Sequence, residues 1–576
     1  MIQSDMTVLL EVHHPDYSHI RDVLSRFAEL EKSPEHVHTY RITPLSLWNA
    51  ASSGRAVDEI LDLFVSYSKF DIAPNVTTEI RHVFGRFGVL KLESNQGKLV
   101  LSSREPRELA ALFGYKSMGA FIDERIDACH VVIRPLQRGR LKQELMNLGH
   151  PVQDLAGYTA GAPLDFSLRK VSVSGHPFAL RKYQQEAVDH FYADGSSLGG
   201  SGVLVLPCGA GKTVIGLGAA VRISAETLIM TSSVTAARQW MAELLDKTTL
   251  TPDQIGEYSG EHKAIRPVTV ATYQIVSHRK KKDEPFTHLD LFAKRNWGLI
   301  IYDEVHLLPA PVFRITADIQ AKRRLGLTAT LVREDGLETD VFSLIGPKKY
   351  DVPWKELEKS GWIATANCEE IRVSLTEEER LTYAAADARA QMRLSAEAEQ
   401  KLAVVQSLAE RHRTDSVLVI GQYLDQLQRV AKALHAPIIT GKTPMSERDA
   451  LYQAFRDRVV PLLVVSKVAN FAIDLPDANV AVQISGQFGS RQEEAQRLGR
   501  ILRPKALGAQ AYFYSVVTKD TKEQDFALNR QRFLTEQGYG YAIKEADELL
   551  GQPLEEPSVP VVSLDAYRKQ KAGGRG

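Results

Sequence analysis

Cysteine is scarce in this chain, which has only Cys129, Cys208 and Cys368 among its 576 residues. Three thiols far apart in sequence provide no disulfide framework, and the absence of a Cys-x-x-Cys pair argues against a zinc site. Three cysteines also cannot supply the four thiolates of an iron–sulfur cluster. We therefore expect reduced thiols, as in proteins of a reducing compartment.

Net charge and long apolar runs are missing as well. The 71 basic residues match the 71 acidic ones, so any basic surface for nucleic acid must be local. The longest apolar runs are about six residues, whereas a membrane-spanning helix needs roughly 20. The N-terminus lacks a basic start followed by a long apolar core, so we expect a cytoplasmic protein. A hydrophobic fraction of 44% excludes wholesale disorder.

Short aliphatic runs indicate two α/β domains in series. Such runs alternate with helix-like segments between residues 202 and 330, and the pattern repeats between residues 416 and 516. This alternation is typical of a parallel sheet with crossover helices. Residues 1–165 instead mix strand-like and helix-like stretches, with a predicted β-hairpin around Asn95-Gln96-Gly97. We expect an α/β fold class, with two tandem parallel-sheet domains after an α+β N-terminal domain.

The expected domain boundaries follow from shifts in this pattern. A Gly- and Pro-bearing stretch at residues 157–163 looks like a linker, and a second break lies near Pro347. After Gly551 the chain is Pro-rich and then basic, which indicates a flexible tail. The predicted domains are residues 1–165, residues 166–347, residues 348–550 with a short helical insert near 376–400, and the tail 551–576.

A glycine-rich loop follows the first aliphatic run of the first α/β domain. The segment LPCGAGKT ends at Thr213 and departs from the strict phosphate-loop pattern at Leu206. Its glycines allow backbone N–H groups to surround phosphate oxygens at a helix N-terminus. Lys212 supplies a positive charge to the β/γ-phosphates, and Thr213 offers a hydroxyl to Mg²⁺. The predicted ATP-binding residues of the loop are Gly209, Ala210, Gly211, Lys212 and Thr213.

Two acids end another apolar run. The segment GLIIYDEVH places Asp303 and Glu304 directly after a strand-like stretch, and His306 two residues later. A carboxylate at the carboxyl edge of a parallel strand can hold Mg²⁺, and its neighbour can orient the attacking water. We predict that Asp303 binds Mg²⁺ together with Thr213 and that both acids are catalytic. The alternative is a pair of solvent-facing acids.

A basic helix face occurs in the second α/β domain. In the segment QRLGRILR, Arg500 and Arg503 are three positions apart and share one face of a helix. Arginines supplied from a second domain can complete an ATP site when the domains close. We predict that Gln496, Arg500 and Arg503 are catalytic, with a solvated basic face as the alternative.

These segments together resemble superfamily 2 helicases. The likeness rests on LRKYQ at residues 180–184, PCGAGKT, DEVH, TAT at residues 328–330 and QRLGRILR. It implies two tandem RecA-like domains that bind ATP. By resemblance, Arg181 and Gln184 belong to the nucleotide site, and His306, Thr328 and Thr330 couple it to nucleic acid.

Further motifs resemble the XPB family of DNA helicases. An Arg333-Glu334-Asp335 tripeptide follows TAT, TSSVTAARQW resembles a second family motif, and residues 466–485 resemble the fifth. The helical insert lies where XPB proteins carry a thumb element, although Tyr383 is its only aromatic residue. The resemblance implies ATP-driven 3′→5′ unwinding or translocation on DNA in repair or transcription. It also implies that the tripeptide acts on the duplex at a fork and that residues 1–165 engage DNA.

Some predicted DNA contacts rest on residue chemistry. Hydroxyls grip a phosphate backbone without reading bases, so Thr272 and Ser466 are candidate contacts. The basic run at residues 278–282 either tracks phosphates or is a solvated surface loop. We expect DNA as the partner, single-stranded or forked, and a nuclease or a repair or transcription protein as a further candidate partner.

Two other functions stay open. One is a duplex translocase without strand separation, although no nuclease motif is evident in the N-terminal block or tail. The other is an ATP-switched DNA-binding scaffold with low turnover. The presence of Glu304, Arg500 and Arg503 argues against the scaffold, because a degenerate motor usually loses one of these residues.

Overall fold

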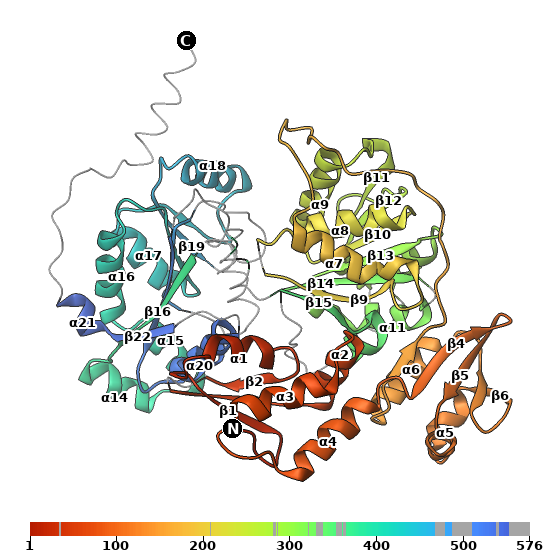
Figure 1. The fold of residues 1–576 in the computed structure, drawn as a ribbon. Coiled ribbons are helices and arrows are strands. Elements are labelled where there is room, and N and C mark those ends of the chain that lie inside the picture. The colour runs from red at the N-terminus through yellow and green to blue at the C-terminus, as the bar shows by residue number, and fades with distance from the viewer. Residues whose placement is uncertain are drawn as a thin grey trace. The chain divides into compact units, whose positions relative to one another are not determined.

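The structure is a computed structural model of the chain (Figure 1). It describes residues 1–33, 36–207, 209–279, 284, 286–320, 322–329, 338–352, 357, 360, 365–466, 478–485, 510–536 and 541–551. The chain divides into two compact units. The first comprises residues 1–206 and 211–352, and the second comprises residues 207–210 and 353–576. Within the described residues, no helix combines the length and apolar character needed to cross a membrane.

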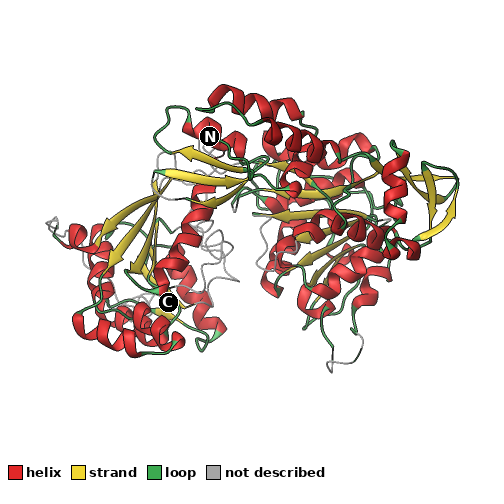
Figure 2. Cartoon of the chain, turned by 90° about the horizontal axis from the view of Figure 1, so that it is seen from below, coloured by secondary structure: helices red, strands yellow, loops and turns green. Residues whose placement is uncertain are grey.

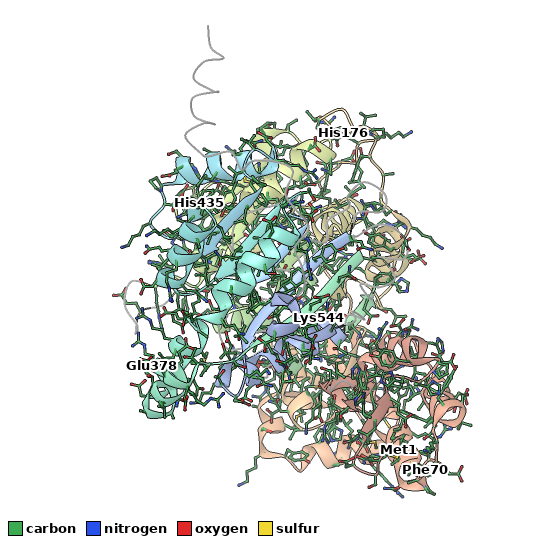
Figure 3. All side chains as sticks on the ribbon, turned by 90° about the vertical axis from the view of Figure 1, so that its left-hand side faces the viewer. Met1, Phe70, His176, Glu378, His435 and Lys544 are labelled. Carbon is green, nitrogen blue, oxygen red and sulfur yellow. The ribbon has the colours of Figure 1, made fainter. Side chains whose placement is uncertain are left out.

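The first unit begins with a small antiparallel sheet of order β1-β3-β2. Its strands are β1 (Thr7–Glu11), β2 (Glu29–Lys32) and β3 (Val37–Arg41). Four helices accompany it: α1 (Tyr17–Leu24), α2 (Pro44–Ser52), α3 (Val57–Tyr67) and α4 (Pro74–Gly85). Phe27, Phe64 and Ile80 are buried in a shared core. Phe70, just after α3, is 60% exposed (Figure 3).

A five-stranded sheet follows, in the order β6-β7-β5-β4-β8. Its strands are β4 (Leu90–Asn95), β5 (Lys98–Ser103), β6 (Ile122–Arg125), β7 (His130–Ile133) and β8 (Val152–Asp154). Its helices are α5 (Pro106–Phe113) and α6 (Arg138–Asn147). Strands β4 and β5 pair antiparallel with Asn95 opposite Lys98, which confirms the predicted hairpin. Gly97 has φ +79°, a conformation that glycine adopts without strain.

The rest of the first unit is a seven-stranded sheet of order β11-β12-β10-β13-β14-β9-β15, in which the paired strands are all parallel. The strands are β9 (Ser201–Val205), β10 (Thr227–Thr231), β11 (Ile255–Tyr258), β12 (Val268–Thr272), β13 (Leu299–Asp303), β14 (Arg323–Thr328) and β15 (Lys348–Asp351). The helices are α7 (Lys182–Tyr192), α8 (Lys212–Ile223), α9 (Val234–Lys247), α10 (Tyr273–Val276), α11 (Ala310–Asp318) and α12 (Glu338–Asp340).

The expected boundary at residue 348 differs from the structure. Strand β15 pairs with β9, so residues 348–351 extend the first parallel sheet, and the first unit continues to Val352. The reason is that Pro347 interrupts the chain locally without ending the sheet, since Val203 N–H donates to the Pro347 carbonyl at 2.9 Å. A proline can precede an edge strand because it removes only its own N–H donor.

The second unit contains another seven-stranded sheet, of order β18-β19-β17-β20-β21-β16-β22, with parallel pairing throughout. The strands are β16 (Thr365–Val373), β17 (Val417–Gly421), β18 (Ile438–Ile439), β19 (Leu462–Ser466), β20 (Val480–Gln483), β21 (Gln510–Thr518) and β22 (Tyr541–Glu545). Figure 2 shows helices beside the strands of both parallel sheets. The predicted fold class, two parallel-sheet α/β domains with an α+β N-terminal part, is therefore confirmed.

Helices of the second unit include the predicted insert. They are α14 (Glu377–Ala385), α15 (Ala388–Ala396), α16 (Gln400–Arg411), α17 (Leu424–Ala433), α18 (Met445–Arg456), α20 (Lys522–Glu536) and α21 (Ala546–Leu550). Helix α14 begins at a Thr376 capping box and carries exposed acids such as Glu378 (Figure 3). The Tyr383 hydroxyl accepts a hydrogen bond from Lys522 N–H, so the insert packs on α20.

The N-terminal part packs against the first parallel-sheet domain. Gly139 of α6 lies so close to α11 that a Cβ would come within 2.3 Å of the Ala317 carbonyl oxygen. Trp48, Met146 and Phe342 form a shared apolar cluster. The stretch at residues 157–163 is equally tight, since a Cβ on Gly161 would lie 2.2 Å from Gly298 Cα. The predicted linker is thus a packed connection.

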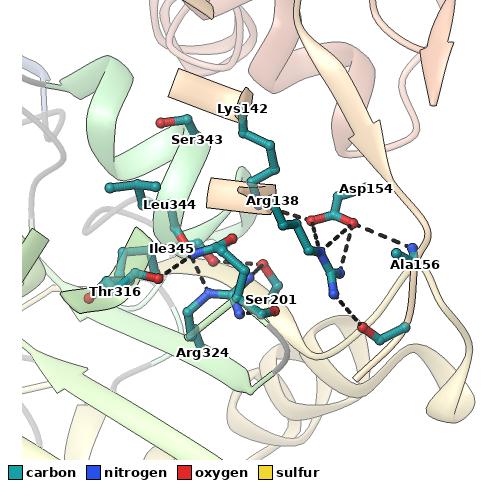
Figure 4. Close-up of polar contacts among 12 residues, drawn as sticks. Arg138, Lys142, Asp154, Ala156, Ser201, Thr316, Arg324, Ser343, Leu344 and Ile345 are labelled. Atoms are coloured by element: carbon teal, nitrogen blue, oxygen red, sulfur yellow. Dashed lines mark hydrogen bonds and ion pairs between the residues drawn. The ribbon is translucent and has the colours of Figure 1, made fainter. Parts of the chain in front are cut away.

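A buried ion cluster stands beside this junction (Figure 4). Asp154 accepts a hydrogen bond from Arg138 Nη2 at 2.7 Å and another from Lys142 Nζ at 3.0 Å. Arg324 lies nearby, completely buried, and donates to backbone carbonyls and to Ser201 Oγ. Burial lowers the pKa of Lys142 to about 8, although Asp154 opposes this shift. The single carboxylate therefore compensates two partly desolvated cations.

Asp154→Asn should destabilise the first unit. The variant leaves Arg138 and Lys142 buried without their anion, which costs about 3–5 kcal/mol in free energy of unfolding. Urea denaturation followed by tryptophan fluorescence measures this. Asp58→Asn is the matched control, because Asp58 pairs with Arg81 at 2.8 Å but is 66% exposed. That control should change stability by less than about 1 kcal/mol. Equal effects at the two positions would contradict the role of the buried cluster.

Candidate functional site

The glycine loop leads directly into a helix N-terminus. Gly209 and Gly211 have φ +83° and +79°, and Gly211 is the N-cap residue of α8. Gly211 has no side chain that could cap α8, and the N-terminal end of a helix favours an anion. A Cβ on Gly211 would lie 2.6 Å from Gln184 Nε2. The left-handed backbone favours glycine here, and any larger residue would also have to displace the Gln184 amide.

The LRKYQ segment meets α8 at this point. Gln184 is buried, and its Oε1 accepts a hydrogen bond from the backbone N–H of Arg181 at 2.9 Å. The guanidinium of Arg181 reaches the Tyr183 hydroxyl at 3.3 Å. The start of α7 is thus fixed locally, and the Gln184 amide is held against Gly211. The structure brings the predicted residue Gln184 to the phosphate-loop end of α8.

The acid pair lies beside Lys212. Lys212 Nζ donates to Glu304 Oε1 at 2.9 Å, with only 11% and 19% of the two side chains exposed. Glu304 has φ +50°, unusual for a residue with a side chain, and its N–H donates to Asp303 Oδ1 at 3.1 Å. Such a backbone conformation is costly, and it is a common feature of functional sites. Lys212, Asp303 and Glu304, predicted from separate motifs, thus form one cluster.

The two carboxyl groups are shifted in opposite directions. Burial, reinforced by the charge of Glu304, raises the pKa of Asp303. Burial would also raise the pKa of Glu304, but the charges of Lys212 and His306 outweigh it and lower this pKa. Glu304 is therefore the more readily ionised acid. A cation placed against Asp303 would stabilise its ionised form.

The DEVH and TAT motifs are also in contact with each other. His306 Nδ1 lies 2.7 Å from Thr328 Oγ1 and 3.5 Å from Glu304 Oε2, and both His306 and Thr328 are buried. Thr328 ends β14, which pairs with β13 on one side and β9 on the other. His306 therefore contacts both Glu304 and the last residue of β14.

Two residues that sequence reasoning missed hold Asp303. Trp240 Nε1 donates to Asp303 Oδ2 at 2.9 Å, and the Tyr273 hydroxyl donates to the Asp303 backbone oxygen at 2.8 Å. Both side chains are buried. A buried tryptophan or tyrosine needs an acceptor for its polar hydrogen, so Trp240 in TSSVTAARQW carried a signal. The sequence could not identify the acceptor.

Other predicted residues are placed separately. Thr272 is buried and its hydroxyl caps α10, accepting from Ile275 N–H. Ser466 ends β19 in the second unit and is also buried. Of the basic run, the Arg279 guanidinium lies over the Phe286 ring, 5.2 Å from its centre. The following predicted residues lie outside the described part of the chain: Thr330, Arg333, Glu334, Asp335, Gln496, Arg500, Arg503 and Lys280–Lys282.

The residues present fit ATP with Mg²⁺. The N-terminus of α8 and the Lys212 ammonium suit phosphate oxygens, while the Thr213 hydroxyl and the Asp303 carboxylate are hard oxygen donors of the kind that Mg²⁺ prefers. Within the described ranges, no group of three or more His, Cys, Asp or Glu could hold a metal ion by itself. A nucleotide-bound Mg²⁺ does not need such a group, because phosphates and waters complete its coordination.

Curated relatives identify the family. The "DNA 3'-5' helicase XPB" of Mycobacterium tuberculosis is 53% identical over 552 residues, covering 96% of this chain and 98% of the relative. This chain belongs to the XPB family of superfamily 2 DNA helicases. The XPB relative from Kineococcus radiotolerans is 51% identical over 552 residues, covering 96% of this chain and 97% of its own length. The Saccharomyces cerevisiae relative, named "General transcription and DNA repair factor IIH helicase/translocase subunit XPB/SSL2", is 32% identical, covering 94% and 71%.

Family profiles match three parts of this XPB-family chain. Residues 357–554 match "ERCC3/RAD25/XPB C-terminal helicase", and residues 177–333 match "Type III restriction enzyme, res subunit". A third profile, "Helicase conserved C-terminal domain", matches residues 1–127. Those residues form the antiparallel sheet and part of the five-stranded sheet, not a parallel-sheet motor domain. The chain is thus an ATP-dependent DNA helicase with two RecA-like domains.

Lys212→Ala should weaken nucleotide binding. The substitution removes the positive charge predicted to hold the phosphates and leaves Glu304, which is only 19% exposed, without its strongest cation. A lost charged contact of this kind weakens affinity by about tenfold or more, measurable with a fluorescent ADP analogue. Lys294→Ala is the control, because Lys294 is 50% exposed in its pair with Asp290. Unchanged affinity in the Lys212 variant would contradict the placement of the phosphate site.

Proposed function

We propose that this XPB-family helicase hydrolyses ATP at the cluster of Lys212, Asp303 and Glu304 and uses the reaction to move 3′→5′ on DNA. The observation that carries the proposal is the 2.9 Å contact between Lys212 Nζ and Glu304 Oε1 beside Asp303. It joins a predicted phosphate-binding residue to a predicted water-activating residue. The 3′→5′ direction of movement is supported by the names of the two bacterial relatives, which include this direction.

Each side chain then has a separate task. Lys212 and the first N–H groups of α8 hold the β/γ-phosphates, and Gln184 lies next to that turn. Asp303 and Thr213 would hold Mg²⁺, which would neutralise charge on the phosphates when bound. Glu304, released from Lys212 when phosphate takes the ammonium, orients the attacking water. The residues Gln496, Arg500 and Arg503 stay predicted catalytic residues.

The contact to nucleic acid runs through other groups. His306 and Thr328 link Glu304 to the chain that leads on to Thr330 and to the Arg333-Glu334-Asp335 tripeptide. We propose that this route makes hydrolysis depend on DNA, and Thr272 and Ser466 stay predicted contacts to the phosphate backbone. The names of the eukaryotic relatives favour a repair or transcription role with partner proteins.

A second candidate function is translocation on duplex DNA without strand separation. The yeast relative's name, "helicase/translocase subunit", favours keeping it. Both functions need the same ATP site, since only the coupling of movement to base-pair opening differs. The two are therefore separated by strand displacement and not by hydrolysis.

ATP hydrolysis should be stimulated by DNA and abolished in Glu304→Gln. The wild type is assayed without nucleic acid, with single-stranded DNA, with forked duplex and with RNA. The variant keeps the shape of Glu304 but loses the base, so we expect a fall of roughly 10²–10⁴-fold in hydrolysis with ATP binding retained. Glu338→Gln is the control, an acid at the start of α12. Negligible wild-type turnover with every nucleic acid would favour the scaffold.

Strand displacement decides between the two motors. A duplex with a 3′ single-stranded tail should be opened, whereas one with a 5′ tail should not. Stimulated hydrolysis without displacement on either substrate would support the duplex translocase instead.

A further inference from the structure

Asp303, the acid of the proposed metal site, accepts hydrogen bonds from residues of two separate helices. Its side chain accepts from Trp240 Nε1 through Oδ2 and from Glu304 N–H through Oδ1, while its backbone oxygen accepts from the Tyr273 hydroxyl. Trp240 belongs to α9 and Tyr273 to α10. The aspartate's position therefore depends on where these two helices lie.

Helix α10 starts at Thr272, which is a candidate for DNA contact, and α9 lies in TSSVTAARQW, which resembles a family motif. Helix α9 begins after Ser233, whose hydroxyl accepts from Ala236 N–H at 3.1 Å. Helix α10 begins after Thr272, which caps it in the same way. The two starts are themselves connected, because Gln274 of α10 donates its side-chain amide hydrogen to the Ser232 carbonyl.

Trp240 also contacts the helix that carries Lys212. A Cβ on Gly216 of α8 would lie 2.4 Å from the Trp240 ring. The indole thus lies between the helix predicted to hold phosphate and the strand that ends in Asp303. An indole N–H is only a donor, so it orients the carboxylate without offering it an acceptor or a titrating group.

We propose that Trp240 and Tyr273 are positioning residues that hold Asp303 for Mg²⁺ and make its placement respond to α9 and α10. The inference rests on the proposed function, because it takes Asp303 as the metal-binding acid. Groups that orient a metal-binding carboxylate affect metal affinity although they do not touch the metal. Displacement of either helix start by DNA shifts a hydrogen bond on this one residue.

The first test measures nucleotide binding without turnover. The affinity of a fluorescent ADP analogue is measured with and without Mg²⁺ for Trp240→Phe and Tyr273→Phe. We expect the gain in affinity that Mg²⁺ gives to fall by roughly tenfold or more, with metal-free binding unchanged. Tyr273→Phe keeps the ring and removes only the hydroxyl, whereas Trp240→Phe replaces the indole with a smaller aromatic ring that has no N–H donor.

The chain offers a matched control for each variant. Trp297 is equally buried, and its Nε1 donates to the Leu291 carbonyl at 3.0 Å. Tyr302 is buried in β13, where its hydroxyl meets Thr316 Oγ1 at 2.9 Å. Trp297→Phe and Tyr302→Phe should retain the wild-type dependence on Mg²⁺. If the Trp240 and Tyr273 variants match these controls, the inference is overturned.

The second test measures the response to DNA. The ratio of ATP hydrolysis with single-stranded DNA to hydrolysis without it should fall in both variants, while DNA affinity without nucleotide stays at the wild-type value. The double variant should lose less than the sum of the single losses, because both donors act on one residue. Full DNA stimulation in both variants would overturn the proposed response to α9 and α10.

The same measurements separate a failure of the proposed metal role of Asp303 from a failure of the positioning role alone. A wild type whose nucleotide affinity does not depend on Mg²⁺ would remove the metal role of Asp303. A wild type that depends on Mg²⁺ while its variants match the controls would remove only the positioning role of Trp240 and Tyr273.

Discussion

The ion pair between Lys212 and Glu304 is the interaction on which the proposed ATP site depends. Two adjacent carboxyl groups buried at the end of one strand would repel each other and would be costly to ionise without a cation. Lys212 reaches them because Gly211, in a left-handed conformation, turns the chain sharply into α8. The parallel order of β9, β14 and β13 then places this turn and the acids at the same edge of the sheet.

The same arrangement lets one site serve two successive purposes. In the described structure the lysine compensates Glu304, and the pKa shifts follow from that contact. In the proposed reaction, a phosphate group competes for the Lys212 ammonium and Glu304 becomes available to water. Ground-state compensation and release of the base are thus both consequences of a single hydrogen-bonded pair.

Much of this could be predicted from the sequence, for physical reasons. Strands such as β9, β10 and β13 are continuous aliphatic runs because both faces of a parallel sheet are buried. The phosphate loop and acid pair stand at their ends. Strands β11 and β16 escaped prediction, because IGEY and TANCEEIRV carry charged residues that resemble loops or surface strands. Glu257 and Glu370 are acids that are nevertheless buried. The hydrophobic pattern of a sequence does not show that a charged residue with ion-pair or hydrogen-bond partners lies in the interior.

Contacts between residues that lie far apart in the sequence could not be predicted either. Trp240 and Asp303 are far apart in sequence, and no local pattern announces their hydrogen bond. The junction at Gly139 and Gly161 was hidden in the same way, since a glycine in a flexible linker and a glycine pressed against another backbone read alike. The Arg333-Glu334-Asp335 tripeptide and the basic helix face with Arg500 and Arg503 stay predictions.

The close backbone contacts at Gly139 and Gly161 bear on how this chain could be rebuilt. Modules joined by free linkers can be exchanged between relatives as cassettes, because only the linker has to match. Here the N-terminal portion shares a surface with Ala317 and Gly298, at distances that leave no room for a methyl group. A chimaera would have to exchange both sides of that surface together. The N-terminal portion and the first parallel-sheet domain would therefore have to be transferred as one piece.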